Sequence, residues 1–159
     1  MTQDELRQAI LAQRQRLDLA VSGLDRVTLE TAPMCGEWSA RDLVGHLHDW
    51  QTILLAAARY ALGGPRPIDV PIEDGQAFNT TRAAARMRER WPETKADFDA
   101  SLEDALAWLS RLTPEQLTTS ADYPWGEPGG TVAALLDVIP AHIDEHCAYI
   151  ETWRQSEAA

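Results

Sequence analysis

The chain has 159 residues, the size of one domain, and we treat 1–159 as a single domain with its core at about 3–155. Hydrophobic residues make up 45% and charged residues 25% of the chain, as in ordinary globular proteins, which excludes low-complexity disorder and collagen-like repeats. With 14 basic against 25 acidic residues, the net charge of −11 repels phosphate backbones and argues against nucleic acid as a partner.

The first two helices are predicted by apolar spacing and by a cap. Apolar residues recur at helical spacing over about 3–24, which predicts a first helix. Ser39, followed three residues later by Asp42, is typical of a capping box. It predicts a second helix over 40–62, which stops at Gly63-Gly64-Pro65.

A Pro/Gly-rich loop over 63–75 follows, and then a third helical stretch over about 74–90. This stretch carries a basic stripe, which we interpret as a solvated helix face. The stripe consists of Arg82, Arg86, Arg88 and Arg90. Pro92 interrupts the stretch and suits the first turn of another helix.

That next helix has apolar residues at helical spacing from Phe98 to Leu112. Thr113-Pro-Glu-Gln is a second capping signature that opens one short turn, and a loop over 118–130 comes after it. The last helix is expected from about Thr131 to Arg154. Pro140 removes one backbone hydrogen bond within it and predicts a kink, a break or a later start.

The fold class follows from these elements. No stretch of five or more residues alternates with β-branched content, so we expect little or no sheet. Four long amphipathic helices predict an all-α, four-helix-bundle domain, in which the loops 63–75 and 118–130 cross over or cover one end.

Location is expected from what the sequence contains. The longest apolar run, 53–58, is far shorter than the roughly 20 residues that cross a bilayer, so we expect no membrane partner. The acidic N-terminus does not resemble a signal peptide. Two cysteines, Cys35 and Cys147, favour a reducing compartment, so we expect a cytoplasmic protein.

The four histidines lie in two short segments, one in the second helix and one in the last. His142 and His146 are four residues apart, so they lie on one helix face, and that face is apolar. On a helical wheel His46 shares the apolar face of its helix, whereas His48 is about 200° away and is expected at the surface. Three histidines therefore face inward.

Three imidazoles with open coordination positions are typical of a catalytic metal site. We interpret His46, His142 and His146 as ligands of one divalent ion, for which zinc, nickel and iron are all suitable. The alternative is three hydrogen-bonded core histidines, which are costly to bury without partners. The pattern His142-Ile-Asp-Glu-His146 also matches a zinc-peptidase motif, but five residues on a bundle helix support that match weakly.

Carboxylates near these histidines are candidate catalytic groups. Asp49 either holds a ligand imidazole or acts as a general base, with a surface position as the alternative. Glu145 lies at the edge of the site, and Asp42 is assigned to the helix cap. The candidate substrate-binding residues are Trp50, Trp125 and Tyr149.

These residues resemble a known family. Trp38-Ser-Ala-Arg-Asp-Leu-Val-Gly-His-Leu47, with an aspartate four residues before the histidine, is similar to the second helix of the DinB/YfiT-like superfamily. The late His-x-x-x-His helix, followed by Trp153-Arg154, is similar too. The Trp-Gly loop before that helix most resembles bundles related to the N-terminal domain of mycothiol-dependent maleylpyruvate isomerase.

The resemblance implies a four-helix bundle with one divalent metal on His46, His142 and His146, and a homodimer. It also implies thiol-dependent transfer, isomerisation or hydrolysis of a small electrophilic molecule, with water or a low-molecular-weight thiol as the activated group. Such an enzyme is a metal-dependent hydrolase or a thiol-dependent S-transferase or isomerase. Two alternatives stay open: a non-catalytic bundle that binds a small molecule or metal, and a purely structural homodimer.

Overall fold

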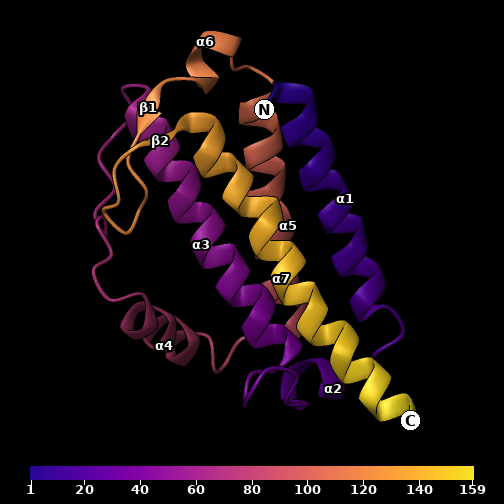
Figure 1. The fold of residues 1–159 in the computed structure, drawn as a ribbon. Coiled ribbons are helices and arrows are strands. Elements are labelled where there is room, and N and C mark those ends of the chain that lie inside the picture. Colours follow the sequence, from indigo (N-terminus) through magenta and orange to yellow (C-terminus); the bar gives the residue numbers. More distant parts are fainter.

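Four long helices packed side by side form the body of the molecule in the computed structural model, which describes residues 1–159 (Figure 1). They are α1 (Gln3–Val21), α3 (Ala40–Ala61), α5 (Trp91–Leu109) and α7 (Val132–Ala158). One continuous apolar core lies between them, and α7 packs against both α1 and α3. The predicted all-α four-helix bundle is therefore confirmed. None of the helices combines the length and the apolar character needed to span a bilayer.

The connection from α3 to α5 runs along the outside of the bundle. Because α3 and α5 point in the same direction, residues 62–90 have to return the length of the bundle before α5 begins (Figure 1). This crossover contains α4 (Gly75–Ala85), which packs chiefly on α3 and has no buried residue. α4 is shorter than the predicted stretch 74–90, since the chain leaves the helix after Ala85 and Arg90 has extended backbone as the N-cap of α5.

Side-chain caps fix where the helices begin. The Ser39 hydroxyl accepts a hydrogen bond from the amide of Asp42, and the Asp42 carboxylate accepts one from the amide of Ser39. The predicted capping box is thus confirmed at the start of α3. Thr113 forms the second predicted box, which opens the short helix α6 (Pro114–Leu117), and Thr131 caps α7.

The first helix ends earlier than predicted. α1 stops at Val21, because the chain turns at Gly23 with a φ of +78°, a value that favours glycine. A six-residue helix, α2 (Arg26–Thr31), follows and is capped by Asp25. Six residues span fewer than two turns, which is too short for apolar periodicity to reveal.

A small sheet ties the predicted loop 118–130 to the end of the bundle. β1 (Ser120–Ala121) and β2 (Gly130–Thr131) pair antiparallel, with Ser120 opposite Thr131. The sheet has only two residues in each strand, in keeping with the expectation of little or no sheet. Because β2 leads directly into α7, it fixes the return of the loop at the start of that helix.

Pro140 does not interrupt the last helix. α7 continues unbroken through 27 residues from Val132, so the predicted break and the predicted later start are wrong. The proline is itself buried, and α7 has buried apolar residues on both sides of it, including Ile139 and Ile143. This packing holds the helix through the missing hydrogen bond.

Candidate metal centre

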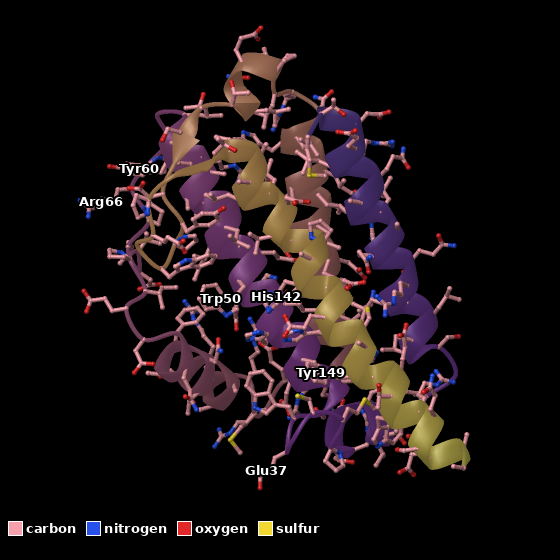
Figure 2. All side chains as sticks on the ribbon, viewed as in Figure 1. Glu37, Trp50, Tyr60, Arg66, His142 and Tyr149 are labelled. Carbon is pink, nitrogen blue, oxygen red and sulfur yellow. The ribbon has the colours of Figure 1, made fainter.

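Two neighbouring helices bring three of the four histidines together. His46 lies on α3, two turns after the Ser39 cap, and His142 and His146 lie one turn apart on α7. α3 and α7 pack side by side, and Figure 2 shows His142 at the same level of the bundle as Trp50 of α3.

The three imidazoles converge closely enough for one ion. Nε2 of His46 lies 3.0 Å from Nε2 of His142, and one ring nitrogen from each of the three histidines lies within 4.8 Å of the others. The rings of His46 and His146 are stacked, with centroids 4.9 Å apart. Tetrahedral zinc with bonds of about 2.0–2.1 Å needs ligand nitrogens roughly 3.3 Å apart. The arrangement therefore suits a small divalent cation.

The surroundings keep these imidazoles neutral. Burial, together with the neighbouring His146, lowers the pKa of His46 to about 4. Burial and the two other histidines lower the pKa of His142 to about 3, and burial also lowers the pKa of His146. Because the ligand form of histidine is the neutral ring, all three are ready to bind a metal at neutral pH.

One nitrogen of the cluster lacks a partner. Nδ1 of His146 is buried and makes no hydrogen bond. Buried polar groups in proteins are nearly always satisfied, so an unpaired imidazole nitrogen beside two other histidines favours a ligand there. The backbone of His142, one turn earlier, also acts on this ring and raises its pKa against burial. Together with the three-nitrogen donor set, the unpaired nitrogen shows that the residues present fit a divalent metal.

Two side chains near the cluster stay outside it. His48 points toward α5, where its Nδ1 lies 3.0 Å from the Ser101 hydroxyl. It faces away from the other histidines, as predicted, but it is half-buried rather than on the surface. Cys147 is fully buried, and burial raises the pKa of its thiol to about 12, so that thiol stays protonated.

A cleft of about 480 Å³ opens beside the three histidines. Its lining is His46, Trp50, Leu54, Asn79, Trp125, Val138, Ala141, His142, Glu145 and His146. Trp50 donates a hydrogen bond from Nε1 to Oδ1 of Asn79, 2.7 Å away, and its ring meets that of Trp125 edge-on at 6.4 Å. The cleft thus combines aromatic walls with a few polar groups, as small-molecule sites do.

Of the other candidate residues, some line the cleft and some do not. Glu145, Trp50 and Trp125 line the cleft, and Glu145 is exposed at it. Tyr149 is not part of the lining, although its ring meets His146 edge-on, with centroids 5.8 Å apart.

Asp49 is buried in an ion pair with Arg86 and lies outside the cleft lining. Two nitrogens of the Arg86 guanidinium donate to it, Nε to Oδ2 at 3.3 Å and Nη2 to Oδ1. Neither a surface position for Asp49 nor a solvated position for Arg86 is correct, since their side chains are 6% and 12% exposed. A carboxylate held in this way is poorly placed to serve a ligand imidazole.

Sequence reasoning missed Asn79, which comes to the cleft from α4. It lines the cleft together with His46, and its side chain raises the pKa of that histidine against the larger effect of burial. Nothing in the local sequence indicates this role, because an Asn on a short polar helix has no distinctive spacing.

The chain matches the DinB superfamily over residues 9–150. It is similar in fold to a solved protein described as Sibling Lethal Factor Precursor, DfsB, with a TM-score of 0.80 and 19% identity over 99% of this chain and 97% of that one. A Streptococcus pneumoniae protein from a structural genomics consortium has a TM-score of 0.78 and 14% identity, over 98% and 91% of the two chains. No functionally curated protein matches this sequence. The chain belongs to the DinB superfamily.

Proposed function

We propose that this protein is a divalent-metal-dependent enzyme that acts on a small electrophilic molecule, with His46, His142 and His146 holding the ion. The observation that carries the proposal is the convergence of three neutral imidazoles at the wall of one open cleft. A divalent metal bound there would lower the pKa of a water molecule or a thiol that it holds. The reaction class is then hydrolysis, or transfer or isomerisation with a low-molecular-weight thiol.

The chain's own residues provide the rest of the site. Trp50, Trp125 and Val138 give the cleft apolar walls that exclude water from a bound molecule. Glu145 is the free carboxylate beside the histidines and is the group positioned to accept a proton there. The thiol cosubstrate and the homodimer that the family resemblance implies are further parts of this proposal.

Metal analysis of site variants tests the ligand set. Purified protein is expected to hold about one divalent ion per chain, and His142→Ala and His146→Ala each to abolish binding, because two imidazoles do not retain the ion. His48→Ala is the matched control from the same helix as His46 and should bind normally. Equal loss from His48→Ala would show that the wrong histidine is assigned. Protein that cannot be loaded with zinc or nickel would overturn the site.

Turnover separates an enzyme from a binding bundle. Metal-loaded protein is mixed with a chromogenic activated aryl halide, with and without a small thiol, and release of halide is followed. Thiol-dependent release that disappears in His142→Ala supports S-transfer, and release without thiol supports hydrolysis. Full metal occupancy with no turnover of any tested electrophile would favour the non-catalytic alternative.

A further inference from the structure

The helix α4 is attached to the bundle without a core of its own. None of its residues is buried, and it packs chiefly on α3. Toward its first half, Asn79 accepts the hydrogen bond from Trp50, whose ring also meets Phe78 edge-on at 5.1 Å. At its C-terminal end, the cap residue Arg86 reaches Asp49. α4 is therefore held to α3 at two points, and only the second is ionic.

The ionic point is a buried, two-pronged pair. Arg86 meets both carboxylate oxygens of Asp49, and its Nη1 also lies 3.3 Å from Glu89. Glu89 in turn accepts a 2.9 Å hydrogen bond from the hydroxyl of Thr94 on α5. Removing one member of a buried pair leaves an uncompensated charge, which is far more disruptive than breaking a surface pair. The Asp49–Arg86 pair therefore holds the C-terminal end of α4 on α3.

The backbone of α3 leaves room for this pair at a single glycine. A Cβ on Gly45 would stand 2.6 Å from Cδ and 3.0 Å from Nε of Arg86. Gly45 lies one turn before Asp49 and directly before His46. The arginine thus crosses α3 on the turn that also carries a metal ligand.

The first attachment point leaves a donor free in the cleft. The indole N–H of Trp50 can only donate, so it fixes Oδ1 of Asn79 toward Trp50. The Nδ2 group of Asn79 makes no hydrogen bond within the chain, while the residue lines the cleft with the three histidines. The Nδ2 group is therefore suited to donate a hydrogen bond to a bound molecule that has an anionic or carbonyl oxygen acceptor beside the metal.

We infer that Asp49 and Arg86 are positioning residues, whose ion pair holds α4 on α3 so that the Asn79 amide faces the metal cleft. Asp49 then acts through α4 rather than on a ligand imidazole. The ligand class that follows is a small molecule with an oxygen or anionic acceptor. That part rests on the proposed metal site, whereas the docking of α4 does not.

Hydrogen exchange on metal-free protein tests the docking. Asp49→Asn is expected to speed exchange of the α4 amides at least tenfold while those of α7 stay unchanged, and Arg86→Met, which keeps the bulk, should do the same. Asp69→Asn is the matched control, since Asp69 pairs with Arg82 of the same helix at 3.3 Å but on the exposed surface. Unchanged α4 exchange in Asp49→Asn and Arg86→Met, or equal acceleration in the control, would overturn the inference.

A cobalt-loaded protein tests what the docking positions. Azide is titrated and its binding is followed by the visible absorption of cobalt. Asp49→Asn and Asn79→Ala are each expected to weaken azide about tenfold, the effect of one hydrogen bond to a charged group. The double variant should be no weaker than either single one, because both act through Asn79. Additive losses would overturn positioning through α4. If cobalt does not bind wild-type protein, the proposed function fails and the exchange experiment decides the docking alone.

Discussion

Gly45 shows how much one missing side chain decides. In a helix interior, alanine is normally more favourable than glycine by about 1 kcal/mol of helix stability. Here the added methyl group would overlap the Arg86 side chain at 2.6 Å, and Thr94 of α5 lies 3.5 Å away on the same side. The helix propensity and the tertiary contact therefore predict opposite signs for one substitution.

We expect Gly45→Ala to lower the free energy of unfolding by roughly 1–2 kcal/mol, because Arg86 has to leave its place between α3 and α4. Urea denaturation of metal-free protein measures this. Gly75→Ala is the control, since its Cβ would meet only Trp50, at an ordinary 3.9 Å. Arg86→Ala should remove most of the penalty in the double variant. A Gly45→Ala protein more stable than wild type would contradict the expected clash.

At this scale the sequence predicts what depends on one helix at a time. The i, i+4 spacing of His142 and His146 and the wheel position of His46 were sufficient to select the three converging histidines. The partner of Asp49 was not predictable, because Arg86 lies 37 residues away and reaches it only through the path of the crossover. A helical wheel predicts the direction of a side chain but not which residue of another element contacts it.

Among the elements, the loop between β1 and β2 determines one side of the cleft. Trp125 stacks on Tyr123, with centroids 4.8 Å apart, and donates a hydrogen bond to Glu127. The loop is also joined to the crossover, where the amide of Ile72 donates to the carbonyl of Pro124 at 2.8 Å. A loop held at both sides presents its tryptophan to the cleft as a fixed wall.

Trp125→Ala is expected to weaken binding of thiophenol to zinc-loaded protein several-fold while metal content stays constant, because an aromatic wall is lost. Titration calorimetry gives the affinity, and the melting temperature is recorded in parallel. Trp108→Ala is the matched control, since Trp108 lies against Arg59 away from the cleft. A variant with a lower melting temperature and unchanged affinity would mean that Trp125 only anchors the loop.

Element boundaries were predictable wherever a local signal marks them. The capping signatures at Ser39 and Thr113 predicted the starts of α3 and α6 to within a residue, and the helix expected from about Thr131 begins at Val132. The unbroken course of α7 through Pro140 was not predictable from a local signal. Buried residues on both sides of the proline stabilise the helix by more than one lost hydrogen bond costs. The pairing of β1 with β2 involves too few residues to leave a pattern.

For the whole molecule, the neutral histidines make stability depend on pH. Burial lowers the folded-state pKa of His46 and His142 to about 4 and about 3, and burial also lowers those of His48 and His146. In the unfolded chain each histidine titrates near 6.5. The unfolded state therefore binds more protons below that pH, and folding loses stability as the pH falls from about 6.5 toward the folded-state pKa values.

The free energy of unfolding of metal-free protein should therefore fall between pH 7 and pH 5, by up to about 1.4 kcal/mol per pH unit for each histidine that stays neutral. Urea denaturation at several pH values measures the slope. This range lies above the titration of ordinary carboxylates, so the histidines dominate it. His142→Gln should give a shallower slope. A flat profile in wild-type protein would mean that the unfolded and folded histidines titrate alike.

Metal binding by the same three histidines would cross-link two helices, α3 and α7, that are far apart in the sequence. His46 and His142 are 96 residues apart, and the segment between them contains the crossover, α5 and the β1–β2 loop. An ion held by both would act as a reversible cross-link across that whole loop, comparable in span to a long-range disulfide. Without the ion, α3 and α7 would be held together by side-chain packing alone, so metal supply would change how firmly these two helices are joined.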